Sequence, residues 1–271
     1  VEVHQADTHT TGMVFGAALS AIISTETNQP SDFIEGDLVF NEIRGAGGMI
    51  DIELFNRGNQ PVDFGGYLVR GPGAGADAEF ALPEGTVAPG GFLVLPYAVF
   101  GFTAAPGDPW FLIKPGGRAI ADAVATPEGA RGRFPDGAGE WLVPDRPTLG
   151  SSNTCTLRQD IVINEIMYHA PPTLETATTP FAENPEQWIE FYNRGSAAVD
   201  LAGWRLEEGV EFQFGPETIL APGAHLVVAN APAALQARWP GIPIIGPFAG
   251  RLSHRDDLLV LRDAVGNPAD R

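Results

Sequence analysis

The feature that most constrains this chain is an internal repeat of three short motifs. An apolar run that contains Asn-Glu comes first, a run that ends in Asn-Arg-Gly comes second, and a Val-Asp segment that ends in an aromatic residue comes third. The two copies occupy residues 38–43, 51–58 and 62–67, and residues 161–166, 188–195 and 199–204. Solenoid repeats have periods of roughly 20 to 50 residues. The much longer spacing here therefore predicts two domains of one kind.

Length and composition agree with two globular β domains. A chain of 271 residues is long enough for two domains that each bury a core. Its 33 Gly and 24 Pro suit many strands joined by turns. The formal net charge of −18 repels phosphate backbones and anionic membrane surfaces, so we do not expect nucleic acid as a partner. No apolar run reaches about 18 residues, and we expect no direct membrane insertion.

Alternation along the chain predicts the first strands of each copy. Residues 50–56 alternate between apolar and mostly acidic positions, as in an antiparallel strand with one buried face. In the second copy the same argument predicts that Ile189 is buried and that Trp188 is at least partly exposed. We also expect Trp204 to be buried. Strict alternation in residues 38–43 places Leu38, Phe40 and Glu42 on one face and Val39, Asn41 and Ile43 on the other.

Gly and Pro separate the remaining segments, which are short and mostly apolar. This spacing is typical of a β-sandwich or barrel. One short helix is predicted at residues 232–239, where Pro precedes Ala-Ala-Leu-Gln-Ala-Arg. The Pro- and Thr-rich insertion at residues 170–185 is predicted to be an exposed loop. We expect residues 131–153 to be irregular.

The repeated motifs resemble the lamin tail domain in its bacterial form. The first copy departs more from the family, because Tyr67 stands where the family has Trp. The resemblance implies an all-β fold of two tandem immunoglobulin-like β-sandwiches. It also implies an accessory or adhesive module beside other domains, often a spore-coat-type kinase or a hydrolase. In the second copy it rests on residues 163–168, 186–193, 199–206, 212–214, 220–223, 226–229, 250–253 and 259–267.

We divide the chain into three parts. Residues 1–36 are expected to be the terminal hairpin and linker of an upstream β domain, since they resemble the last hairpin of jelly-roll or galactose-binding-like domains. Residues 37–153 and 154–271 are expected to be lamin tail domains, the second one incomplete at its C-terminal end. Both ends should then expose apolar edges, and we expect residues 1–23 to pair with a neighbouring sheet by strand addition. Hydrogen exchange on residues 13–23 would test this.

Two pairs of glutamates are the candidate metal ligands. Glu42 with Glu53, and Glu165 with Glu190, lie on strands expected to be neighbours. Paired carboxylates can share a proton or, with nearby carbonyls, hold calcium. The alternative is that each Asn-Glu ties down loop backbone or faces solvent. Because no Asp-x-Asp-x-Asp-Gly loop is present, we expect a structural role, with calcium as the alternative and no other cofactor.

Other reactive side chains lack a catalytic pattern. His169, His225 and His254 do not have the spacing of a zinc site, and no Gly-x-Ser-x-Gly motif is present. Cys155 is the single cysteine, so it cannot form an internal disulfide. Aromatic residues of the second copy offer a platform for carbohydrate, although we expect them to pack in the core or between strands. They are Trp188, Tyr192, Trp204, Trp239 and Phe248.

The absence of a complete catalytic set predicts a non-enzymatic structural or interaction module. We expect it to space and present neighbouring domains of a large exported bacterial protein, or to mediate contacts between surface proteins. The chain begins at Val1 without a basic signal segment and is interpreted as a piece of a longer precursor. An extracellular or cell-surface location is inferred from the resemblance. The alternative function is a calcium- or carbohydrate-binding accessory module attached to an enzyme outside this chain.

Overall fold

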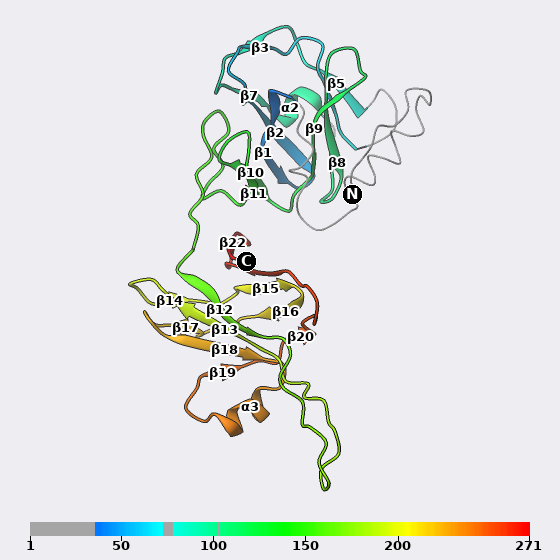
Figure 1. Cartoon of the computed structure of the whole chain (residues 1–271). Coiled ribbons are helices and arrows are strands. Elements are labelled where there is room, and N and C mark those ends of the chain that lie inside the picture. The colour runs from blue at the N-terminus through cyan, green and yellow to red at the C-terminus, as the bar shows by residue number, and fades with distance from the viewer. Residues whose placement is uncertain (1–35, 73–77, 102) are drawn as a thin grey trace. The chain divides into compact units, whose positions relative to one another are not determined.

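A computed structural model describes residues 36–72, 78–101 and 103–271 and divides the chain into two compact units (Figure 1). Unit 1 ends at Thr156, and unit 2 begins at Leu157. The hairpin and linker expected in residues 1–35, and their strand addition, lie outside the described residues. In the described part nearly all regular structure is β-strand, so the predicted all-β sandwich fold is confirmed.

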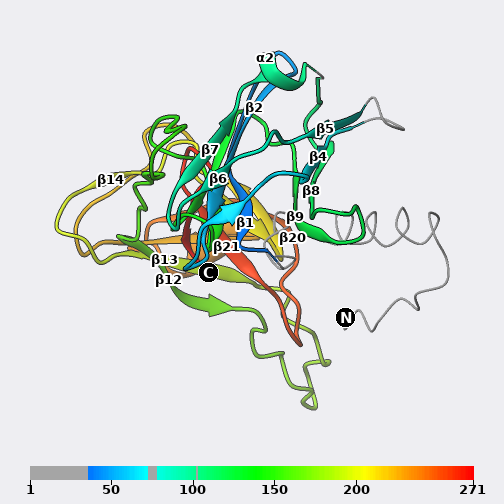
Figure 2. The ribbon, with the colours of Figure 1, turned by 90° about the horizontal axis from the view of Figure 1, so that it is seen from above.

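Unit 1 is a sandwich of two sheets, with one additional two-stranded ribbon. The five-stranded sheet has the order β11-β10-β1-β2-β7, the four-stranded sheet has the order β5-β4-β8-β9, and β3 pairs with β6. Figure 2 shows β4, β5 and β8 as a layer beside the one that contains β2 and β7. The elements are β1 (Leu38–Ala46), β2 (Met49–Asn56), β3 (Val62–Asp63), β4 (Leu68–Arg70), β5 (Glu79–Ala81), β6 (Thr86–Val87), β7 (Phe92–Leu95), α2 (Tyr97–Phe100), β8 (Pro109–Ile113), β9 (Ile120–Ala125), β10 (Ala130–Phe134) and β11 (Glu140–Leu142).

The core of unit 1 lies between the two sheets. One sheet contributes Phe40 and Ile52, and the other contributes Val69 and Trp110, all fully buried. The Trp110 Nε1 group donates to Thr126 Oγ1 at 2.8 Å, which satisfies the polar end of the largest core side chain.

Unit 2 repeats this construction with two more sheets. They have the orders β12-β13-β18-β19 and β20-β16-β15-β21-β22, and β14 pairs with β17. The elements are β12 (Ile161–Met167), β13 (Trp188–Asn193), β14 (Val199–Asp200), β15 (Arg205–Glu208), β16 (Val210–Gln213), β17 (Ile219–Leu220), β18 (His225–Ala229), α3 (Pro232–Arg238), β19 (Ile244–Ile245), β20 (Ala249–Gly250), β21 (Leu259–Arg262) and β22 (Pro268–Asp270).

The strand pairings of the two units correspond. The ladders β1·β2 and β2·β7 recur as β12·β13 and β13·β18, and the ladders β4·β5, β4·β8 and β8·β9 recur as β15·β16, β15·β21 and β21·β22. The two units differ at their sheet edges. β10 and β11 have no counterpart among the described strands of unit 2, whereas β19 and β20 have none among those of unit 1.

The strict alternation expected for residues 38–43 is wrong. The β1·β2 register shifts between Phe40 and Glu42, so Asn41 is the extra residue of a β-bulge. The bulge turns Ile43 into the core beside Phe40 and places Glu42 opposite Glu53. The same shift occurs in unit 2 between Ile163 and Glu165. The repeated Asn-Glu is thus the sequence signature of a bulge.

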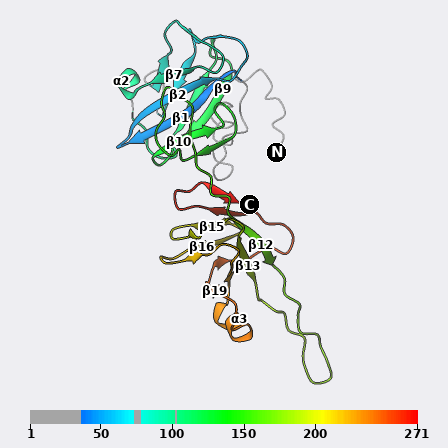
Figure 3. The ribbon, with the colours of Figure 1, turned by 90° about the vertical axis from the view of Figure 1, so that its left-hand side faces the viewer.

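The irregular structure expected for residues 131–153 is also wrong in its first part. Residues Ala130–Phe134 and Glu140–Leu142 form the antiparallel hairpin β10·β11, and β10 pairs with β1 (Figure 3). The Pro-Asp-Gly-Ala-Gly run is the turn of this hairpin and not a loop between domains. Its glycines Gly137 and Gly139 have positive φ, a conformation that glycine adopts without strain.

Three other expectations are confirmed. The predicted helix is α3, which begins with Pro232, and the insertion at residues 170–185 is almost entirely exposed, with one bridge between Thr173 and Ala182. Ile189 and Trp204 are buried, and Trp188 is only partly buried. In the part of the chain that the structure describes, no helix has the length and apolar character needed to cross a membrane.

Candidate functional site

The two predicted glutamate pairs occupy equivalent positions on the first ladder of each unit. Glu42 lies opposite Glu53 in the β1·β2 register, and Glu165 lies opposite Glu190 in the β12·β13 register. Their environments differ. Glu42 and Glu53 are fully buried, whereas Glu165 is exposed and Glu190 is partly buried.

In unit 1 the buried carboxylates accept hydrogen bonds from the segment that follows β11. Glu42 Oε2 accepts from the Thr148 amide at 2.9 Å and from Thr148 Oγ1 at 2.8 Å. Glu53 accepts from Asn41 Nδ2 at 2.9 Å and from the amide of Gly150. Both carboxylates therefore hold loop backbone against the sheet, and their lone pairs are used by the protein itself.

Asn41 extends this network to the turn of the hairpin. Its Oδ1 accepts from the Gly137 amide at 2.8 Å, and its Nδ2 also donates to Asp136 Oδ1 at 3.0 Å. The bulge of β1 thus bonds to the β10·β11 turn as well as to Glu53. Asn41 is buried, so each of these bonds satisfies a group that water cannot reach.

Asn153 closes the network from the other side. Its Nδ2 donates to the carbonyls of Asn41 at 3.2 Å and Arg133 at 3.0 Å. A Cβ at Gly132 would collide with the Asn153 side chain, so glycine is required where β10 passes beneath it. We call residues 130–153, with this set of bonds, the closing segment.

A buried ion pair anchors the closing segment to the opposite sheet. Arg133 Nη2 lies 3.1 Å from each carboxylate oxygen of Asp122, and Arg133 Nε donates to the Phe40 carbonyl at 2.9 Å. Both side chains have no exposed surface. The guanidinium carbon lies 4.8 Å from the Trp141 ring centroid, which adds a cation–π contact. Burial raises the pKa of Asp122 to about 6, although Arg133 and two backbone amides oppose this.

Sequence reasoning missed the partners of the predicted glutamates. Thr148, which bonds to Glu42, and Gly150, which bonds to Glu53, lie about 100 residues away from these glutamates in the chain. The sequence showed that residues 131–153 lie outside the three repeated motifs, but it did not show which residues they contact.

Burial raises the pKa of Glu53 to about 7, and the negative charges of Glu42 and Asp136 act in the same direction. The Asn41 and Gly150 donors oppose the shift. Glu53 therefore holds a proton when folded at pH values where the unfolded chain has released it. Under these conditions the folded state binds more protons, so raising the pH lowers stability.

We accordingly predict that the free energy of unfolding falls between about pH 4.5 and pH 7. The rise in pKa from 4.5 to about 7 corresponds to a loss of at most about 3 kcal/mol across this window. Urea denaturation at several pH values measures this loss of stability.

The variant Glu53→Gln cannot ionise at this position, so its stability should depend less on pH. Glu128→Gln, at an exposed position, should keep the pH dependence of wild type. Asp122 contributes in the same direction, so the difference between wild type and Glu53→Gln isolates Glu53. Identical profiles in these two proteins would contradict the assignment.

In unit 2 the equivalent groups are less buried than in unit 1. Glu190 Oε1 accepts from Asn164 Nδ2 at 2.7 Å and lies 2.9 Å from His225 Nδ1. Asn164 and Glu165 are exposed. His225 also packs against Tyr192, with ring centroids 4.6 Å apart. This corner of unit 2 combines two carboxylates, an amide and an imidazole on one surface.

The other candidate residues do not gather into one site. His169 stacks on His254 with ring centroids 4.4 Å apart, while His225 contacts Glu190 instead. In the described part of the chain, no three His, Cys, Asp or Glu side chains are grouped so that they could hold a metal ion. Burial raises the pKa of the Cys155 thiol to about 11, so the thiol stays protonated at neutral pH.

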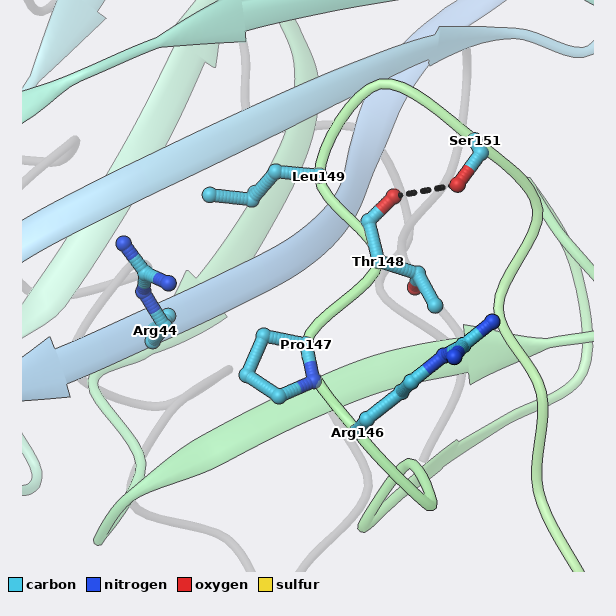
Figure 4. A pocket seen from close by; sticks show the side chains of 6 residues that line it. All are labelled: Arg44, Arg146, Pro147, Thr148, Leu149 and Ser151. Atoms are coloured by element: carbon cyan, nitrogen blue, oxygen red, sulfur yellow. Dashed lines mark hydrogen bonds between the residues drawn. The ribbon is translucent and has the colours of Figure 1, made fainter.

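The five aromatic residues do not form a single platform. Trp204 and Phe248 belong to the core of unit 2, Trp188 packs beside a smaller cluster, and Trp239 is exposed. A shallow depression in unit 1, lined by Arg44, Arg146, Pro147, Thr148, Leu149 and Ser151, is open to solvent (Figure 4). The Ser151 hydroxyl in it donates to the Thr148 carbonyl, so it serves the loop that Glu42 holds.

The fold of unit 2 and one family comparison agree on the class of protein. Unit 2 is an immunoglobulin-like β-sandwich of two sheets with one additional two-stranded ribbon. Residues 156–271 match the family model of the Lamin Tail Domain, a non-catalytic immunoglobulin-like domain. Unit 2 is thus similar to lamin tail domains over its whole length.

Two other comparisons add little. No curated protein matches the chain. Among solved structures, the crystal structure of red sea bream transglutaminase is similar with 11% identity and a TM-score of 0.20. That alignment covers 93% of this chain and only 31% of the transglutaminase. A TM-score this low does not indicate a shared fold or a shared function.

Proposed function

We propose that the chain is a non-enzymatic structural and interaction module made of two tandem lamin tail domains. The observation that carries this proposal is the recurrence in unit 1 of the strand pairings of unit 2, which matches the family. The bulged Asn-Glu motif recurs at the same ladder position in both units. Unit 1 is then a lamin tail domain whose sequence has diverged and which carries its own closing segment.

The use of the acidic residues supports a structural role. In unit 1 both glutamates are buried and accept hydrogen bonds from loop backbone and from polar side chains. Groups engaged in this way stabilise one conformation and are not accessible to a substrate. The module would space and present neighbouring domains, or contact other surface proteins.

We propose an extracellular or cell-surface location in a bacterium, within a larger exported protein. The acidic composition and the single cysteine are compatible with this location, and the resemblance of the repeated motifs to bacterial lamin tail domains supports it. A net charge of −18 disfavours nucleic acid and anionic membranes as partners.

The alternative is a calcium- or carbohydrate-binding accessory module. The observation in its favour is that the exposed Glu165 lies opposite the partly buried Glu190 in unit 2. Calcium takes about six to eight oxygen ligands, and two carboxylates supply fewer than this. Trp239, which is exposed, is the aromatic residue best placed to meet a sugar.

Calorimetric titration of the whole chain with calcium, and a glycan panel, test the proposed function. We expect neither to show saturable binding. A calcium isotherm that disappears in Glu165→Gln but persists in Glu175→Gln, a change of the same charge in the exposed insertion, would replace the proposal by its alternative. Saturable binding of a glycan that is lost in Trp239→Ala would do the same.

A further inference from the structure

The strand β12 forms an open edge of its sheet, whereas its equivalent β1 does not. In unit 1 the outer side of β1 pairs with β10, with Glu42 opposite Gly132 and Ile43 opposite Arg131. In unit 2 β12 is the terminal strand of the sheet, and no described strand pairs with its outer side. An open edge presents unpaired N–H and C=O groups to which another strand can add.

Side-chain burial shows what the missing strand would cover. Asn41, Glu42 and Ile43 have no exposed surface, and β10 with the rest of the closing segment lies over them. Their counterparts Asn164, Glu165 and Ile166 are all exposed, and Ile166 is 45% accessible. The side chain of Ile166, whose counterpart Ile43 lies in the core of unit 1, is thus exposed to solvent, and so are Asn164 and Glu165.

The edge of β12 also retains the acceptor for an arginine. Asp270 accepts from the Ile163 amide at 2.7 Å, just as Asp122 accepts from the Phe40 amide at 2.9 Å. In unit 1 Arg133 donates to that carboxylate and to the carbonyl of the same Phe40. Unit 2 therefore contains both acceptors, the Asp270 carboxylate and the Ile163 carbonyl, in the arrangement that receives a guanidinium in unit 1.

We propose that the edge of β12 binds an arginine-bearing β-hairpin from a polypeptide segment that is not part of these 271 residues. The hairpin adds antiparallel to β12 and directs its arginine to Asp270 and the Ile163 carbonyl. Amide and hydroxyl donors after the hairpin meet Glu165 and Glu190, as Thr148 meets Glu42 in unit 1. The inference rests on the proposed function, since it names the partner chemistry of that interaction module.

Two other occupants fit the observations less well. Residues 1–35 contain no Lys or Arg, so they cannot supply a guanidinium to an edge that carries three carboxylates. The hairpin Ala130–Leu142 of a second copy is already paired with its own β1, and its Arg133 is fully buried there. Releasing it would expose the charge pair that anchors unit 1.

A synthetic peptide with the sequence of residues 127–153 tests the proposal on the whole chain. We expect saturable binding by fluorescence anisotropy and slower hydrogen exchange at the outward-facing amides of β12. The same peptide with Arg133→Gln should bind about 30-fold or more weakly, and so should the unchanged peptide with chain variant Asp270→Asn. Chain variant Asp256→Asn, a matched loss of one exposed acidic charge, should bind as wild type does.

Several outcomes would overturn the proposal. They are a lack of binding, equal affinity of the two peptides, or a concentration-dependent dimer of the unmodified chain in which exchange at β12 slows. Circular dichroism of Asp270→Asn checks that it folds. If Asp270→Asn does not fold, the difference in affinity between the unchanged peptide and the Arg133→Gln peptide for the wild-type chain still tests the proposal. Failure of the peptide to bind leaves the non-enzymatic module intact, whereas calcium or glycan binding refutes the module without affecting the peptide result.

Discussion

Replacement of Arg133 by methionine is expected to lower the free energy of unfolding of unit 1 by about 3 to 5 kcal/mol. The side chain is fully buried, and it is the counter-charge of Asp122, which is also fully buried. Methionine fills much of the same volume but leaves the carboxylate with only backbone donors, the amides of Phe40 and Ala123. An uncompensated buried charge is one of the few single changes with so large a cost.

Two companion variants separate the buried charge from the general cost of mutation. Arg70→Met removes the arginine of an ion pair with Glu79 that is 44% exposed on the arginine side, and it should cost at most about 1 kcal/mol. Adding Asp122→Asn to Arg133→Met removes the unpaired charge and should recover part of the loss. Chemical denaturation of the whole chain measures all three. If Arg133→Met were no more damaging than Arg70→Met, the ion pair would not anchor the closing segment.

Truncation of Ile189 to alanine is expected to cost unit 2 about 2 to 5 kcal/mol. Ile189 is fully buried in the centre of β13, where its neighbours in register are Ile166 on β12 and Val228 on β18. The change removes three carbon atoms from a core that both sheets share, and the sheet backbone cannot collapse to fill the cavity.

The control for this prediction is the same substitution on the surface. Ile219→Ala truncates a side chain that is 64% exposed, and it should change stability by no more than about 0.5 kcal/mol. Thermal or urea unfolding of the two variants gives the comparison. A loss below about half a kcal/mol for Ile189→Ala would show that the register of β13 is wrong.

The strands could be predicted because their information is local. Alternation identified residues 50–56 and the burial of Ile189, and Pro at the start of an Ala-rich run identified α3. The bulge at Asn41 could not be predicted in this way, because it breaks the alternation on which the prediction depends. The repeat contained the clue, since both copies place Asn-Glu at this position.

The sequence predicted that the two glutamates of each copy face each other, but it did not predict the residues to which they bond. Opposing positions of Glu42 and Glu53 follow from the pairing of two consecutive strands. Whether the pair is buried depends on Thr148 and Gly150, about 100 residues later, and a Pro- and Gly-rich sequence gave no sign of that contact. The same motif in unit 2 is exposed, so the motif alone does not specify its environment.

The closing segment has a further consequence for how unit 1 is made in the cell. Its bonds join β1, the first described strand of the unit, to residues near the end of the unit, for example Glu42 to Thr148 and Asn41 to Asn153. Contacts of such high contact order form only after the intervening chain is available, and the chain emerges from the ribosome N-terminal end first. Unit 1 therefore cannot complete its fold during translation until residue Asn153 has emerged, and until then Glu42, Glu53 and the outer side of β1 remain accessible to chaperones and to other nascent strands.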